Sequence, residues 1–131
     1  MSRHFLYLTN SRLVSVSTQG KRLVARREFA VSGAGASEFE RYLAGLGPVP
    51  TYLITDLTEE DFRLDTIPHV GTRDREAMVA RKLTQIFRNT PYRYAAMQGR
   101  ESEGRRDDRV IYTAITNAEV LRPWVEAIER H

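Results

Sequence analysis

The chain has 131 residues, of which 41% are hydrophobic and 28% are charged, and its net charge is +3. This composition is typical of one globular domain with a sizeable core. The absence of cysteine excludes disulfides, thiolate metal sites and cysteine nucleophiles, and no apolar run approaches the about 18 residues that a membrane-spanning helix needs. The first residues also lack the pattern of a secretory leader, so we expect a cytoplasmic protein.

The charged residues are segregated along the chain. Residues 1–31 hold six basic and one acidic side chain, residues 32–72 two and seven, residues 73–98 six and two, and residues 99–131 six and seven. A nucleic-acid surface favours one continuous basic stripe with stacking aromatic residues, whereas an acidic block separates the two basic blocks here. Solvated faces that attract one another within the fold are therefore the favoured interpretation.

The chain opens with three β-rich runs, at residues 4–9, 12–18 and 21–31. Asn10-Ser11 and Gln19-Gly20 fall between these runs, where hairpin turns are needed. The pattern therefore predicts an antiparallel meander of three strands.

A helix and a further strand are predicted next. Ser37 followed by Glu40 is a capping-box pattern, and apolar residues follow at helical spacing until Gly47. The short apolar run at residues 52–56 is typical of a central or parallel strand that is buried between helices. A right-handed crossover through the helix would place this strand beside the first strand and parallel to it.

Residues 57–108 are predicted to form an inserted helix and hairpin. After an acidic turn at residues 57–61 and an extended segment at residues 62–67, Thr72 is the expected N-cap of a helix over residues 74–89. The core face of this helix is predicted from apolar residues at three- and four-residue spacing. They are Met78, Val79, Leu83, Ile86 and Phe87.

Two more strands and a helix complete the predicted order. The strands are expected at residues 91–98 and 108–116, joined by a charged loop. The helix is expected at residues 117–130, where Pro123 either introduces a kink or marks the true first turn.

Asp56 is the clearest candidate for chemistry, because it ends the run at residues 52–56, where α/β folds usually place ligands. Acidic residues follow it closely, so a metal or general-base site is conceivable. Carboxylates at the end of a strand more often cap a turn and stay solvated, and the three histidines lack metal-ligand spacing. We therefore assign no catalytic, cofactor-binding or metal-binding residue, and keep Asp56 as a candidate contact to a ligand or partner.

Tyr92 and Tyr94, next to the basic helix, could form a stacking platform for single-stranded nucleic acid. The favoured interpretation instead packs both rings under the helix, with their hydroxyls reaching solvent. A hairpin beside an amphipathic helix also offers an edge strand and a groove, which suits protein recognition. On this interpretation Arg81 and Arg88, on the polar face of the helix, join the two tyrosines as candidate partner contacts.

The order of the predicted elements resembles the first half of actin-like proteins of the type IV pilus inner-membrane platform and of the cytoplasmic part of the type II secretion L protein. The nearest stretches are residues 8–16 (LTNSRLVSV), at the position of the first phosphate loop, and residues 110–128. The resemblance implies an α/β (α+β mixed sheet) fold, a ribonuclease-H-like or actin-like half-domain. Residues 1–131 would be a single domain, with an actin-like core of residues 1–56 and 109–131 and an inserted subdomain of residues 57–108.

The first loop departs from the pattern of this family. Actin-like ATPases keep an acidic residue and glycines there, because the backbone must approach phosphates and a carboxylate must organise a metal ion. Residues 8–12 are LTNSR and contain neither, so Asn10 and Ser11 are candidate ligand contacts only. We expect one half of an actin-like nucleotide-binding fold, with a degenerate phosphate loop and no cofactor.

The function expected from these features is a non-enzymatic protein-interaction module. The partner would be a protein of a membrane-associated pilus or secretion-type assembly, and it could be membrane-anchored. The chain would reach the inner face of the membrane through that partner, without inserting directly and without binding nucleic acid. The alternative is a nucleotide-dependent or nucleic-acid-binding domain that uses the basic surface of residues 73–93. Salt dependence separates the two, because phosphate contacts weaken steeply as ionic strength rises.

Overall fold

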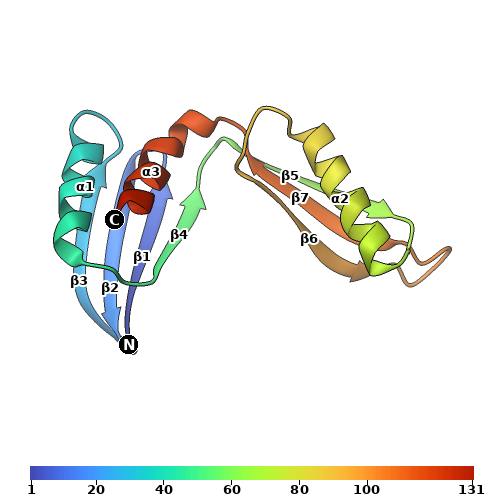
Figure 1. Cartoon of the computed structure of the whole chain (residues 1–131), viewed down its shortest axis with the longest axis horizontal. Coiled ribbons are helices and arrows are strands. Elements are labelled where there is room, and N and C mark those ends of the chain that lie inside the picture. Colours follow the sequence, from blue (N-terminus) through green and yellow to red (C-terminus); the bar gives the residue numbers. More distant parts are fainter. The chain divides into compact units, whose positions relative to one another are not determined.

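A computed structural model describes residues 1–131 and divides the chain into two compact units. The first unit comprises residues 1–58 and 119–131, and the second comprises residues 59–118. Together they hold seven strands and three α-helices, a mixed α+β architecture (Figure 1). No helix is long and apolar enough to cross a membrane.

The first unit is built on a four-stranded sheet of order β3-β2-β1-β4. The expected meander is present, because β1 pairs with β2 and β2 with β3, both antiparallel. The crossover is also confirmed, since β4 pairs with β1 in parallel. The strands are β1 (Ser2–Thr9), β2 (Arg12–Gln19), β3 (Arg22–Ala30) and β4 (Thr51–Asp56).

Two helices, α1 (Gly35–Leu46) and α3 (Arg122–Arg130), cover one face of this sheet (Figure 1). They meet where the rings of Phe39 and Trp124 lie 5.5 Å apart, and where Arg130 pairs with Glu40 at 2.7 Å. Because side chains alternate along a strand, every second residue of β1 faces the helices. The buried residues of this core are His4, Leu6, Leu8, Leu13, Ser15, Phe29, Phe39, Leu43, Leu57, Leu121, Trp124 and Ala127.

The predicted start of α1 is wrong. The helix begins at Gly35, its N-cap is Ala34, and no side chain caps it, so Ser37 and Glu40 lie within the helix. A side chain at Gly35 would overlap the carbonyl oxygen of Ala30, 1.6 Å from an ideal Cβ position. The close approach of the helix to the end of β3 therefore selects glycine at this position and sets where the helix begins.

β4 was expected to be buried, as a central or parallel strand; the parallel pairing is confirmed, but the burial and the central position are wrong. It is an edge strand, and its residues alternate between half-buried and exposed. Tyr52 and Ile54 are about half exposed, at 48% and 50%. The outer face of this sheet, opposite the helices, therefore carries apolar residues on β4 and exposes Tyr7 of β1.

The second unit packs one helix on a three-stranded antiparallel sheet of order β5-β7-β6. Its strands are β5 (Glu60–Ile67), β6 (Arg93–Arg100) and β7 (Asp108–Ile115), and its helix is α2 (Thr72–Ile86). The core consists of Ile67, Phe87, Val110, Tyr112 and Ala114. Met78, Val79, Leu83 and Ile86 pack against this cluster, which confirms the predicted core face of the helix.

The boundaries of this unit differ from the predicted ones. Thr72 is the first residue of α2 and not its cap, and Glu60 and Asp61 begin β5 rather than closing a turn. β7 pairs with β5 and β6, so residues 109–118 belong to the second unit, whereas we predicted them in the core with residues 1–56. Strand partners far apart in sequence decide this membership.

The last segment begins with a short 3-10 helix, η1 (Ala118–Val120), and continues as α3. Pro123 lies in the first turn of α3, which is the second of the two positions we expected for it. Leu121, Trp124 and Ala127 are buried, so α3 presents one apolar side to the sheet and to α1.

Candidate functional site

Asn10, Ser11 and Asp56 lie at one end of the first sheet, since Asp56 is the register partner of Thr9. The Asn10 side-chain carbonyl accepts the backbone N–H of Thr58 at 2.8 Å, and the Ser11 N–H donates to Thr9 Oγ1. The exposed Asp56 accepts the Tyr7 hydroxyl at 2.5 Å. These contacts hold the ends of β1 and β4 and the neighbouring loops together. No group of three or more His, Cys, Asp or Glu side chains that could hold a metal ion is present.

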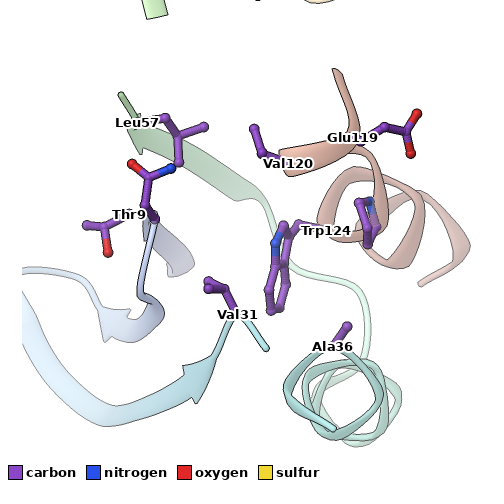
Figure 2. Close-up of a pocket in the computed structure, with 9 residues that line it drawn as sticks. Thr9, Val31, Ala36, Leu57, Glu119, Val120 and Trp124 are labelled. Carbon is purple, nitrogen blue, oxygen red and sulfur yellow. The ribbon is translucent and has the colours of Figure 1, made fainter. Parts of the chain in front are cut away.

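A small pocket of about 180 Å³ lies at this same end of the sheet. Figure 2 shows the indole of Trp124 in its centre, between Val31 and Ala36, with Leu57 and Val120 further out. The other residues that line it are Thr9, Asn10, Glu119 and Pro123.

The chemistry of this pocket does not suit a polyphosphate. Its one charged lining residue is Glu119, which is paired with Arg122, and no lysine or arginine lines it. A nucleotide needs cations or clustered backbone N–H groups around its phosphates. The pocket could hold at most a small, largely apolar group.

Two of the basic residues on the surface of residues 73–93 bind other groups of the protein. Lys82 is paired with Asp65, and the guanidinium of Arg93 donates to the carbonyl oxygens of Phe87 and Thr90 at 3.0 and 3.1 Å. The Asp65 carboxylate raises the pKa of Lys82 and keeps it charged. Arg81 is exposed on α2, and Arg88 is exposed just beyond the end of the helix.

Tyr94 does not lie as we predicted. Tyr94 is 67% exposed and is the register partner of Thr113, whereas the strand residues under α2 are the next ones along, Ala95 and Tyr112. Tyr92 is half-buried and precedes β6. The alternation was correctly identified but assigned to the wrong face. Packing of the Tyr94 ring under the helix is therefore excluded.

A groove of about 380 Å³ lies between α2 and β6. Its helix wall combines apolar side chains with one half-buried arginine and one carboxylate, and its strand wall is apolar. The lining residues are Arg75, Glu76, Val79, Ala80, Leu83, Tyr94, Ala95 and Met97. β6 is an edge strand of its sheet, so one of its edges has no neighbouring strand. This volume lies within the range of known ligand-binding sites.

Of the seven residues that we predicted as candidate contacts, only Tyr94 lines the groove. Arg75, Glu76 and Met97 were missed, because helical spacing separates core from polar faces but does not mark the flank between them. One signal was available. Arg75, Val79 and Leu83 recur at four-residue spacing, and this row lies along one side of the helix.

Exposed apolar residues also gather on the outer face of the second sheet. Phe62 and Leu64 of β5 are 59% and 74% exposed, and they alternate with residues that face α2. Phe62 and Tyr94 share Thr113 as a register partner, so the three side chains form a row across the sheet. Large contiguous patches of exposed apolar side chains are uncommon on the surface of a monomer, and here Thr113 separates the two rings.

Neither models of known protein families nor sequences of curated proteins match this chain. Among solved structures it is similar to the cytoplasmic domain of EpsL, an inner-membrane component of the type II secretion system of Vibrio cholerae. The TM-score is 0.60 at 11% identity, over 99% of this chain and 53% of that one. The chain thus spans about half the length of that domain. At this identity the similarity shows the fold alone, and the α+β fold expected from the sequence is confirmed to that extent.

Proposed function

We propose that this chain is a protein-interaction module with no catalytic activity of its own. The observation that carries the proposal is the groove between α2 and β6, which joins an apolar floor, a cation and an open strand edge. The proposed occupant is an extended segment of a partner protein that pairs with β6 as an added strand. Its alternate apolar side chains would enter the groove, which is a recurrent mode of peptide recognition.

Charge defines the chemistry of this segment further. Arg75 is half-buried at the groove and makes no ion pair. Glu76 beside it opposes an anion, but residues 73–98 hold six basic and two acidic side chains in all. A partner segment with an acidic residue next to its apolar ones therefore complements the groove better than a basic segment does.

The proposed setting is a membrane-associated assembly of the pilus or secretion type, with the chain at the cytoplasmic face. Two features support this. The structural neighbour is the cytoplasmic domain of an inner-membrane secretion component, and the order of elements resembles the first half of an actin-like protein. We propose the actin-like relationship on the order β-β-β-α-β, with the second unit inserted after β4.

The alternative, a nucleic-acid or nucleotide-binding domain, has less support. Two of the basic residues on the 73–93 surface are held by protein groups, and the exposed Tyr94 has no second exposed ring next to it in the groove. Binding sites for single strands combine a continuous basic track with several stacking rings.

The proposal is tested by selecting binders from a library of random peptides displayed on phage. We expect the selected peptides to alternate apolar residues with at least one Asp or Glu, and to protect the amides of β6 from hydrogen exchange when bound. Arg75→Glu should weaken these peptides about tenfold or more. Arg41→Glu, an exposed change on α1 of the first unit, is the matched control and should leave affinity unchanged.

Two results would contradict this proposal. One is a set of selected peptides with no acidic preference and no protection of β6. The other is binding that falls steeply with salt and extends equally to a single-stranded oligonucleotide, which would favour the nucleic-acid alternative.

A further inference from the structure

One end of the first sheet combines exposed aliphatic side chains with basic ones, and we call it the basic tip. It consists of Met1, Arg3, Lys21, Arg22, Leu23 and Val24. The start of β1 and the β2–β3 turn meet there, because the Gly20 N–H donates to the Met1 carbonyl at 2.9 Å and Arg3 is the register partner of Thr18. Figure 1 shows the N-terminus beside this turn.

The turn that forms the tip depends on Gly20. Its φ of 61° lies in the left-handed region, which glycine adopts without strain, and no neighbouring atom lies within 4 Å of its Cβ position. The turn reverses the chain so that Lys21 and Arg22 follow immediately. Thr18 then pairs with Leu23, which places the aliphatic residues at the beginning of β3.

The aliphatic residues of the tip are open to solvent. Met1 is 78% exposed, Leu23 is 58% exposed and Val24 is 51% exposed. β3 is an edge strand, so Leu23 and Val24 have no further strand beside them. Three large exposed apolar side chains at the same end of a sheet indicate a surface that is covered in use.

The charge around these residues has one sign. No Asp or Glu occurs in residues 1–27. Further along the strands, Arg12 and Arg26 pair with Glu28, and Arg27 lies 5.0 Å from the ring centres of Phe29 and Tyr42. Arg3, Lys21 and Arg22 have no ion pair, so the tip itself carries uncompensated positive charge.

The neighbouring loop does not change this balance. Residues 47–50 connect α1 to β4 at the same end, and the Pro50 carbonyl accepts the His4 N–H at 2.9 Å. Their sequence, Gly-Pro-Val-Pro, has no charged side chain.

We propose that the basic tip binds the surface of a membrane rich in anionic lipids, as a peripheral contact that does not span the bilayer. Lysine and arginine near an anionic leaflet are attracted to its headgroups, and exposed aliphatic side chains enter the interface between headgroups and acyl chains. A nucleic acid fits less well, because the tip offers no aromatic ring for stacking. This surface lies in the first unit, whereas the peptide groove lies in the second, so the two proposals are independent.

The test is co-sedimentation of the whole chain with vesicles of phosphatidylglycerol and phosphatidylcholine in equal parts, compared with vesicles of pure phosphatidylcholine. We expect binding to the mixed vesicles only, with a bound fraction that falls as salt is added. Lys21→Glu/Arg22→Glu should reduce binding about tenfold or more, because two attractive charges become repulsive. Arg105→Glu/Arg106→Glu changes the net charge equally in the β6–β7 loop and should leave binding intact.

A second variant tests the aliphatic part separately. Leu23→Ser/Val24→Ser keeps every charge and alters two exposed side chains, so the fold should persist, as circular dichroism can verify. It should bind mixed vesicles several-fold more weakly. Added inorganic phosphate, matched to sodium chloride in ionic strength, should compete no better than the chloride does. Equal losses in the loop variant, equal binding to pure phosphatidylcholine, or equal binding to a single-stranded oligonucleotide would overturn the proposal.

Discussion

At the scale of single residues, His4 is the most informative position. It is buried in the core of the first unit, where its Nε2 lies 2.6 Å from Ser15 Oγ and its Nδ1 lies 3.5 Å from Thr51 Oγ1. Burial lowers the pKa of this imidazole, because the charged form loses its hydration. His4 is therefore a neutral structural residue at neutral pH. The Ser15 hydroxyl beside it is 0% exposed, so the pair cannot reach a substrate.

The lowered pKa of His4 predicts how stability depends on pH. Above about pH 6.5, His4 is neutral in the folded and unfolded chains and its contribution is fully present. Below this value the unfolded chain takes up a proton that the folded chain does not, so stability falls by up to about 1.4 kcal/mol per pH unit. We expect the melting temperature to fall between about pH 6.5 and 5. In His4→Gln, which is less stable overall, this fall should be smaller.

The comparison of the two proteins isolates His4. Contributions of the other groups are common to both proteins and cancel in the difference. Three carboxylates have a lowered pKa: Glu28, Glu40 and Asp65. Their contribution to stability is lost only at lower pH, below the ordinary pKa of a carboxyl group. An identical slope for wild type and variant between about pH 6.5 and 5 would show that burial of His4 does not control this dependence.

Two glycines of α1 give a second residue-scale prediction. A Cβ at Gly35 would lie 1.6 Å from the Ala30 carbonyl oxygen, a backbone atom that cannot move without displacing β3. Gly35→Ala should therefore destabilise the protein by about 3 kcal/mol or more. Gly45 has nothing within 4 Å of its Cβ position, so Gly45→Ala should stabilise the helix by about 0.5 kcal/mol. Urea titration of both variants measures the two effects, and similar midpoints would contradict this reading of the α1 start.

At the scale of elements, α2 carries the clearest prediction. Leu83 packs against the core of the second unit, although it is only half-buried, whereas Arg81 is exposed and makes no ion pair. Leu83→Ala should cost about 2 kcal/mol, the lower end for such truncations, and Arg81→Ala should stay near zero. Equal shifts in the midpoint of thermal unfolding would mean that the core face of the helix is assigned wrongly.

The same helix shows what periodicity can and cannot predict. Five apolar positions identified its core face, because three- and four-residue spacing depends only on helix geometry. The cap at Thr72 was wrong, as was the capping box at Ser37, because many sequences satisfy these patterns and tertiary contact decides which residue begins a helix. At α1 that contact is the approach of Gly35 to Ala30.

Strand burial was predicted less well than strand existence. Residues 52–56 are apolar on both faces, which is typical of a central strand, yet β4 lies at an edge with Tyr52 and Ile54 about half exposed. Sequence spacing cannot report which strands lie next to one another. The exposed apolar residues of β4 indicate a surface that is covered in use, because an edge strand normally carries charged residues.

At the scale of the whole molecule, element order was the most predictable property. The succession β-β-β-α-β and its parallel β1–β4 pairing follow from local patterns and from the handedness of crossovers. The assignment of β7 to the second sheet does not, because its partners β5 and β6 are chosen by non-local pairing. For the candidate groove, the sequence predicted only that a hairpin would lie beside a helix. Its lining residues other than Tyr94 could be identified only from the structure.

The first unit also leads to a prediction about nucleotides. Its pocket is lined by Thr9 and Asn10, in the loop that we expected to be a degenerate phosphate loop, but Trp124 occupies the centre of the pocket and no lysine or arginine lines it. Asp56 is the nearest candidate metal ligand, and it is exposed and accepts a hydrogen bond from Tyr7. One exposed carboxylate leaves a magnesium ion mostly hydrated and weakly held. We therefore expect this 131-residue chain neither to bind nor to hydrolyse ATP.

Trp124 makes the experiment direct, because it is the single tryptophan of the chain and lines the pocket. Its fluorescence should stay unchanged when magnesium-ATP is added up to millimolar concentration, calorimetry should show no saturable heat, and no phosphate should be released. Asp56→Ala should behave identically, since no catalytic step depends on that carboxylate. A saturable fluorescence change in the low micromolar range that Asp56→Ala abolishes would instead make Asp56 a ligand-binding residue and the chain a nucleotide-dependent protein.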